Sequence, residues 1–259
     1  MVELKNKNAT VCIDKGELVG YVVNGHEFIH QKGSPGWGSS DTEMFPIIGP
    51  VDQANFRVST PKGEAIQDQH GLLRQFDYDL ISQSETRAVF QKNYKAGTEI
   101  TNSKYPAKST EPLMSWPYDF QFEKSFHLTE TGLEVTFKIT GEKDMPFMLG
   151  YHPAFKLHTA SPTITANNKE ITLDEVLAVG SRALHVPDCT SITLKDEKEV
   201  TIITEGFGNF MCWTEVRNMV CIEPISFYPY AVEQEHLNQG FKEVGEESVF
   251  KVVLTPLVL

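Results

Sequence analysis

In two neighbouring stretches of the chain the apolar residues recur at every second position. Residues 129–132, Thr-Glu-Thr-Gly, separate them and supply a turn. Alternation with a period of two is typical of a β-strand with one buried face, so residues 120–139 predict an antiparallel hairpin. A register slip of one residue would bury the polar partners, so the pattern itself fixes the pairing. The apolar positions are Phe120, Phe122, Phe126, Leu128, Leu133, Val135, Phe137 and Ile139.

Turn signals elsewhere favour the same structural class. Residues 9–31 hold short β-rich runs broken at residues 14–16 and at Asn24-Gly25, a good hairpin turn. Residues 93–118, rich in Asn, Gly, Ser, Pro and Thr, predict one long surface loop that flanks a site. We find no amphipathic helix. The expected fold is all-β, and residues 1–259 fit a single domain of that class.

The charge of the chain limits its partners. The formal net charge is −12 and no cluster of Lys and Arg is present. Nucleic acids and anionic membranes are bound through such clusters, so we expect neither as a partner. A neutral small molecule is the easier ligand to propose. The first residues lack a signal-peptide core and no run reaches the eighteen apolar residues of a membrane span, which predicts a cytoplasmic protein.

The four cysteines indicate free thiols. They are scattered, form no C-x-x-C pair and have no histidine placed to complete a zinc site. Disulfides and a structural metal are therefore not expected, and the predicted metal ligands are none. The cysteines are Cys12, Cys189, Cys212 and Cys221.

A lone histidine follows an apolar run in residues 147–155. His152 stands between Gly150-Tyr151 and Pro153. Proline lacks an N–H and pushes the preceding residue toward extended backbone, which predicts that His152 lies at a strand end. Such a histidine either caps the strand as a half-buried residue or forms the wall of a catalytic cavity.

Three other segments carry polar or aromatic residues in comparable settings. Glu223 ends the apolar run 219–222 and precedes a proline, as His152 does. His70 and Arg74 are polar residues in a stretch otherwise made of Gly and apolar residues. Trp37 lies in the turn-rich loop 33–40, where it is either a buried anchor or a stacking surface for a ligand.

Four motifs in chain order resemble the aldose 1-epimerases, also called galactose mutarotase-like proteins. The likeness is greatest to their shorter bacterial branch, where the segments read roughly FPIVG, HGFAR, GGHPAF and IEP. Each motif alone is weak, but four in order at compatible separations are specific. They are Phe45-Pro46-Ile47-Ile48-Gly49, His70-Gly71-Leu72-Leu73-Arg74, Gly150-Tyr151-His152-Pro153-Ala154-Phe155 and Cys221-Ile222-Glu223-Pro224.

The resemblance implies a β-supersandwich of antiparallel sheets with an open groove for a free hexose such as galactose or glucose. It implies that Glu223 is the general base that takes the proton of the anomeric hydroxyl. His152 would be the general acid that protonates the ring oxygen, and His70 would assist by hydrogen bonding. The ring opens, the bond next to the aldehyde rotates, and closure gives the other anomer. No cofactor is needed. Glutamate and histidine have ordinary pKa values of ~4.3 and ~6.5, which suit these roles near neutral pH.

The chain departs from the family pattern at positions that bear on the substrate. Pro50 stands where many relatives have an Arg, Gln75 where an Asp is common, and Tyr151 where a second Gly is usual. Other residues would then contact the sugar. The expected contacts are Arg74, Arg57, Trp37 and Tyr151.

Three alternatives stay open at this stage. A non-catalytic sugar-binding protein of the same fold would keep the groove, and the loss of the Arg at Pro50 favours it. A mutarotase for hexose phosphates would need a cationic pocket, which the acidic balance of the chain disfavours. A glycosidase needs two carboxylates, and only Glu223 is well placed.

Overall fold

The computed structural model describes residues 1–257 and consists mainly of β-strands. The larger sheet has nine antiparallel strands in the order β17, β16, β19, β20, β24, β13, β12, β9, β8. Their bounds are β8 Asp79–Gln83, β9 Arg87–Tyr94, β12 Phe120–Leu128, β13 Leu133–Gly141, β16 Thr163–Ala166, β17 Lys169–Thr172, β19 Ser191–Lys195, β20 Glu199–Glu205 and β24 Ser248–Leu257.

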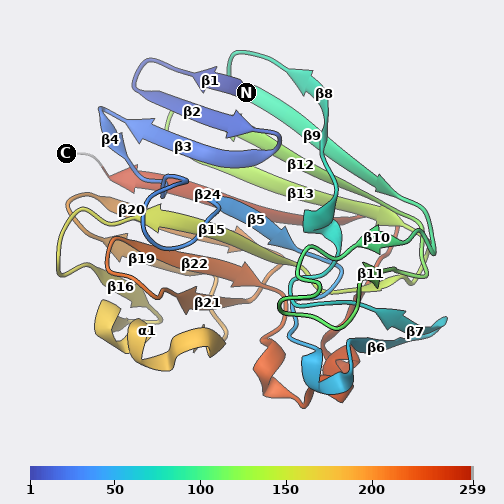
Figure 1. The fold of residues 1–259 in the computed structure, drawn as a ribbon. Helices are drawn as coiled ribbons and strands as arrows, with labels where there is room; N and C mark the ends of the chain where they lie inside the picture. Colours follow the sequence, from blue (N-terminus) through green and yellow to red (C-terminus); the bar gives the residue numbers. More distant parts are fainter. Residues whose placement is uncertain (258–259) are drawn as a thin grey trace.

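A five-stranded antiparallel sheet lies in front of the nine-stranded sheet in Figure 1. Its order is β18, β21, β22, β15, β5. The ring centroids of Phe137, in the larger sheet, and Tyr151, in the smaller one, are 5.0 Å apart, so the two sheets share a core. The bounds are β5 Asp41–Met44, β15 Gly150–Lys156, β18 Leu184–Val186, β21 Asn209–Trp213 and β22 Met219–Ile225.

Smaller sheets surround this pair. A four-stranded meander packs beside the two sheets, and three two-stranded ladders are formed by segments that link their strands. The bounds are β1 Val2–Lys5, β2 Ala9–Asp14, β3 Glu17–Val23, β4 His26–Glu27, β6 Arg57–Thr60, β7 Gly63–Ile66, β10 Ile100–Thr101, β11 Leu113–Met114, β14 Pro146–Phe147 and β23 Lys242–Glu243.

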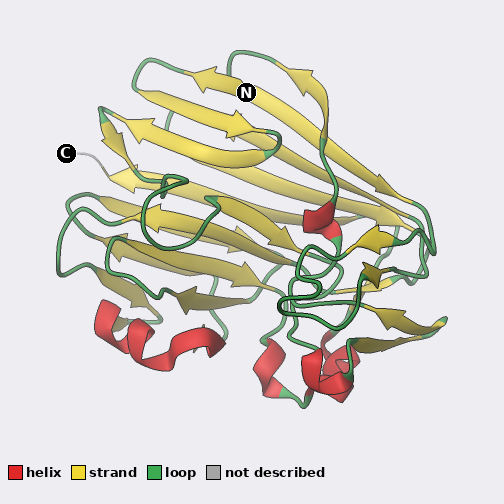
Figure 2. Cartoon of the chain, in the orientation of Figure 1, coloured by secondary structure: helices red, strands yellow, loops and turns green. Residues whose placement is uncertain are grey.

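Helical segments are short and peripheral (Figure 2). The α-helix α1, Leu173–Val179, begins with a capping box in which Thr172 and Glu175 satisfy each other's backbone N–H. We expected no helix, yet the spacing of Thr172 and Glu175 carries this start signal. The 3-10 helices are Asp52–Ala54, Leu73–Gln75, Gly180–Arg182, Pro229–Ala231 and Gln234–Gly240. In the described part of the chain no helix is long and apolar enough to cross a membrane.

The predicted hairpin is confirmed, register included. β12 pairs with β13 so that Leu128 lies opposite Leu133 and Phe122 opposite Ile139. One polar residue, Lys124, shares the inward parity and is fully buried. Its Nζ lies 2.9 Å from Asp41 Oδ2 and 2.6 Å from Glu43 Oε1, so a charged cluster sits inside the core.

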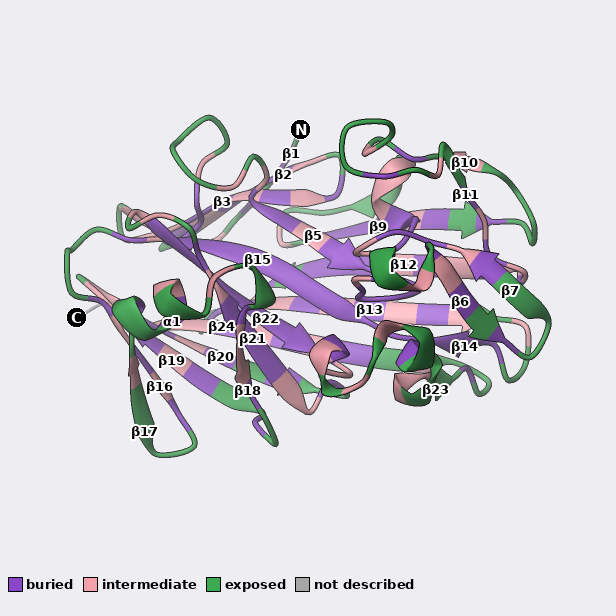
Figure 3. Ribbon diagram, turned by 60° about the horizontal axis from the view of Figure 1, so that its bottom comes forward, coloured by how far each residue is buried: buried purple, intermediate pink, exposed green. Residues whose placement is uncertain are grey.

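The strand β15 is buried along almost its whole length, as the purple ribbon of Figure 3 shows. One face of it packs on the nine-stranded sheet, where Tyr151 meets Phe137. The other face lies under loops from several parts of the chain and carries His152. A strand covered on both sides reads as a continuous apolar run rather than an alternation.

Candidate active site

His152 and Glu223 lie directly across from each other on neighbouring strands. The pairs Gly150–Ile225 and Ala154–Cys221 set the register of β15 against β22, and this register places His152 opposite Glu223. The Nε2 atom of His152 is 3.3 Å from Oε1 of Glu223, and their side chains are 7% and 2% exposed. A buried acid and base are therefore in contact.

Both residues lie within strands, so the prediction of strand ends was wrong. β15 continues through Pro153 to Lys156, and β22 continues through Pro224 to Ile225. The prolines interrupt the ladder rather than the strand, because the paired residues of β15 and β22 skip residues 151–153.

A groove of about 700 Å³ opens over this pair. Its size lies within the range of about 300–1,000 Å³ that is usual for small-molecule sites. Its wall comes from loops that are distant in sequence, as is common for sites built on a rigid sheet. Residues that line it include Trp37, Pro50, His70, Arg74, Lys104, Lys108, His152, Arg182, Trp213 and Glu223.

Trp37 forms part of the groove wall and is half-buried. Its ring stacks on His152, with centroids 4.2 Å apart and planes inclined by 30°. Its backbone N–H lies 3.4 Å from the sulfur of Met219, which fixes the loop against β22. Of the two interpretations left open by the sequence, the groove wall is the one that the geometry supports.

His70 and Arg74 reach the groove from one tight segment. His70 has a positive φ of 77°, and a Cβ on Gly71 would lie only 2.2 Å from the carbonyl oxygen of Phe45. Only glycine fits there, which explains the His-Gly pair. The ring of His70 meets that of His152 edge-on at 5.7 Å. Arg74 donates from Nε to the carbonyl of Glu43 at 2.7 Å.

Burial dominates the electrostatics of the pair. It raises the pKa of Glu223 to about 8, although the nearby Arg74 acts in the opposite direction. Burial and Arg74 together hold the pKa of His152 well below its ordinary value of 6.5. The pKa of His70 is lowered in the same way, chiefly by burial and then by Arg74. Because the two groups interact, His152 and Glu223 titrate as a unit that holds one proton at neutral pH.

Two residues expected to contact the sugar lie elsewhere. Tyr151 points to the opposite face of β15, where its hydroxyl donates to Asp41 at 2.6 Å in the core. Alternation along the strand explains this, because neighbours of His152 must face away from it. Arg57 lies on β6 and pairs with Glu111 at 3.0 Å, outside the groove lining. We leave both residues out of the proposed site.

Several groove residues were missed by the sequence analysis. Lys104 and Lys108 come from the loop that was expected to flank a site, and no motif marks them. Lys104 pairs with Asp68 at 3.0 Å. Arg182 and Trp213 come from the segment between β17 and β22. Long-range folding alone brings these side chains together.

One group at the base of the groove has the composition of a metal site. Ligand atoms of His152, Cys221 and Glu223 lie within 4.8 Å of one another. Burial raises the pKa of the Cys221 thiol well above its ordinary value, and Glu223 raises it further. Metal binding requires a deprotonated thiolate, so these residues suit proton transfer better than metal ligation.

The sequence profile of the aldose 1-epimerase family matches residues 55–207. This range includes His70 and His152 and ends before Glu223. Protein LacX, plasmid, from Lactococcus lactis subsp. lactis is 26% identical over 163 residues, which are 60% of this chain and 50% of that protein. The chain thus matches about half the length of this curated relative.

Solved structures share the fold over nearly the whole chain. A galactose mutarotase-like protein from Lactobacillus casei ATCC 334 superimposes with a TM-score of 0.78 at 17% identity and covers 99% of this chain and 100% of its own. A galactose mutarotase related enzyme from Lactobacillus acidophilus gives a TM-score of 0.80 at 18% identity, with 99% and 97% covered. At these identities the likeness establishes the fold, a galactose mutarotase-like arrangement of antiparallel sheets.

Proposed function

We propose that this chain, which belongs to the aldose 1-epimerase family, interconverts the α and β anomers of a free hexose. The contact of 3.3 Å between His152 and Glu223 at the base of the groove carries the proposal. Opening a hemiacetal ring requires one proton to leave the anomeric hydroxyl and another to reach the ring oxygen. A paired acid and base supplies both transfers. The whole of residues 1–259 would serve this activity as one domain.

Glu223 acts as the base and His152 as the acid. In the empty groove burial favours the uncharged pair, with the shared proton on the carboxyl. Sugar hydroxyls that donate hydrogen bonds to the carboxylate stabilise its charged form. The proton then passes to His152, which leaves Glu223 ready to accept the anomeric proton. Ring closure on the other face returns both protons and restores the pair.

The other groove residues hold the sugar. Trp37 and Trp213 supply apolar surfaces for the faces of a sugar ring, as aromatic side chains commonly do. The guanidinium of Arg74 offers charged donors to hydroxyls, and burial lowers its pKa only to about 10, so it stays protonated. His70 is placed to hydrogen bond to the ring or to a neighbouring oxygen.

A hexose phosphate is a second candidate substrate. Lys104, Lys108 and Arg182 line the groove, and a phosphate needs cationic side chains of this kind. The net charge of the chain hides this local arrangement. The neutral sugar remains the first candidate because Lys104 is already paired with Asp68.

Polarimetry tests the proposal directly. Fresh solutions of α-glucose, α-galactose and α-glucose 6-phosphate change rotation slowly on their own. We expect the protein to accelerate the change for at least one free hexose. Acceleration only for the phosphate would select the second candidate. If none of the sugars responds although they bind, the protein is a non-catalytic carbohydrate-binding protein.

A further inference from the structure

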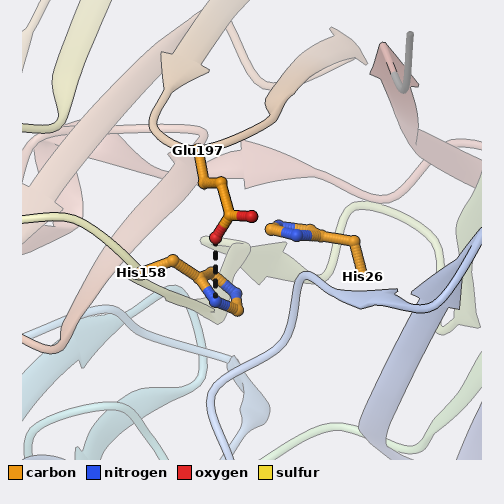
Figure 4. A group of neighbouring side chains, drawn as sticks. All are labelled: His26, His158 and Glu197. Carbon is orange, nitrogen blue, oxygen red and sulfur yellow. Dashed lines mark ion pairs between the residues drawn. The ribbon is translucent and has the colours of Figure 1, made fainter.

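A second cluster of histidines lies away from the groove. Its members are His26, His158 and Glu197, which we call the outer histidine cluster. None of them lines the groove. His26 begins β4, His158 follows the end of β15, and Glu197 lies in the turn between β19 and β20. Figure 4 shows the three side chains converging from these separate segments.

The side chains of the cluster have the separations of a metal site. One ligand atom from each lies within 4.8 Å of the other two. The Nδ1 of His158 is 3.8 Å from Oε2 of Glu197. The ring centroids of His26 and His158 are 4.2 Å apart. Zinc binds nitrogen and oxygen at about 2.0–2.2 Å, which puts tetrahedral ligand atoms about 3.3–3.5 Å apart. Small rotations of the three side chains would bring their ligand atoms to the separation that a zinc ion needs.

The tautomer of His158 is set by its other ring nitrogen. Nε2 lies 2.9 Å from the main-chain carbonyl oxygen of Glu27. A carbonyl can only accept, so Nε2 carries the proton and Nδ1 of the neutral ring keeps its lone pair. That lone pair faces the carboxylate of Glu197. With the ring neutral, Nδ1 and the carboxylate are two acceptors 3.8 Å apart, and a cation between them would be bound by both.

This hydrogen bond has the form usual for a metal-bound histidine. Such a ring commonly donates its second N–H to a backbone carbonyl or a carboxylate, which fixes its orientation and increases its basicity. The two imidazoles of the cluster repel each other if both are charged. A metal ion requires both rings in their neutral form.

The backbone around the cluster is already held in place. The carboxylate of Asp196, next to Glu197, accepts from the backbone N–H of His158 at 2.5 Å and of Thr159 at 3.0 Å. The turn after β19 is thereby joined to the segment after β15. The carboxylate of Glu27, next to His26, accepts from the N–H groups of Tyr21 and Ile29 at 2.8 Å each. All three ligand-bearing segments are fixed before any ion binds.

We propose that His26, His158 and Glu197 bind a divalent first-row transition-metal ion, with zinc as the representative. The donor set of two imidazoles and one carboxylate suits zinc and leaves one coordination position for water. The ion joins three chain segments and stabilises the end of β15, the strand that carries His152. The site lies on the surface and is separate from the groove, so it takes no part in the sugar chemistry.

Zinc titration of the untagged full-length chain by isothermal calorimetry tests this. We expect one zinc ion to bind the wild type. His26→Gln, His158→Gln and Glu197→Gln should each weaken binding by about tenfold or more. Because Glu197 lies on an exposed turn, its variant should fold like the wild type, and thermal unfolding with chelator present checks this.

Two control variants make the result specific. His127 lies 3.8 Å from Glu134, the same separation as in the cluster, and no group of three ligands includes it among the described residues. His127→Gln should therefore leave zinc affinity unchanged. His152→Gln should also leave zinc affinity unchanged, because His152 lies in the groove and not in the outer histidine cluster. No zinc binding, equal losses for Glu197→Gln and His127→Gln, or a loss confined to His152→Gln would each overturn the proposal.

Discussion

The indole ring of Trp37 lies against the imidazole ring of His152, with centroids 4.2 Å apart and planes inclined by 30°. The loop that carries Trp37 is more than a hundred residues away from β15 in sequence. A sugar bound at the acid–base pair would therefore lie close to the indole. This contact couples occupancy of the groove to a spectroscopic signal.

We predict that sugar binding changes the tryptophan fluorescence and that Trp37→Phe reduces the change. Trp213 also lines the groove, so the double variant with Trp213→Phe should lose the change entirely. The remaining Trp116 is fully buried in the core and should not respond. A titration in which the double variant keeps the wild-type change would remove both residues from the sugar site.

Arg74 and Arg57 form a matched pair for testing substrate contacts. Arg74 lines the groove, whereas Arg57 pairs with Glu111 outside it. Arg74→Ala should raise KM by a factor that corresponds to ~1.5–3 kcal/mol, the range for a hydrogen bond to a charged group. Arg57→Ala should leave KM unchanged. Equal effects of the two substitutions in the mutarotation assay would contradict this placement.

The buried Lys124 should be essential for folding stability. Its removal leaves Asp41 and Glu43 as uncompensated charges in the core. Lys124→Met should lower the free energy of unfolding by about 3–5 kcal/mol in chemical denaturation. Lys138, which pairs with Glu247 at 2.6 Å on the surface, is the control, and Lys138→Met should cost at most about 1 kcal/mol. Similar losses for both variants would show that the cluster does not act as a buried unit.

The rate should fall as the pH rises above about 8. Burial raises the pKa of Glu223 to about 8 and holds that of His152 well below 6.5. At a pH between the pKa of His152 and that of Glu223, the pair holds one proton. This singly protonated pair can act as acid and base together. Above pH 8 the last proton leaves and the acid is lost. The pH profile of kcat/KM measures this, and a rate that keeps rising through pH 9 would indicate catalysis by a base alone.

The sequence predicted the sheets well because their signals are local. The alternation at residues 120–139 determines the hairpin, its register and its buried face without help from the rest of the chain. The sequence motifs likewise predicted that His70, His152 and Glu223 would share one site, and the structure brings all three to the groove.

Other features depended on contacts between distant segments. His152 was expected at a strand end because Pro153 follows it, but β5 and β22 on either side hold the strand together. Tyr151 was expected to contact the sugar because of its place in a motif. Its side chain faces away from that of His152, because neighbouring residues of a strand point to opposite faces. The lysines of the groove and the outer histidine cluster have no sequence spacing that reveals them. Only the packing of loops places them together.

The role of Glu223 as the base is the central claim, and Glu223→Gln tests it most directly by polarimetry. Glutamine keeps the size and most hydrogen bonds but cannot accept a proton at neutral pH. We predict normal folding, retained sugar binding and a loss of mutarotation of ~10² or more. Glu215→Gln, at another carboxylate that lines the groove, should keep the wild-type rate. A Glu223→Gln variant that binds sugar and still accelerates mutarotation at the wild-type rate would contradict the mechanism.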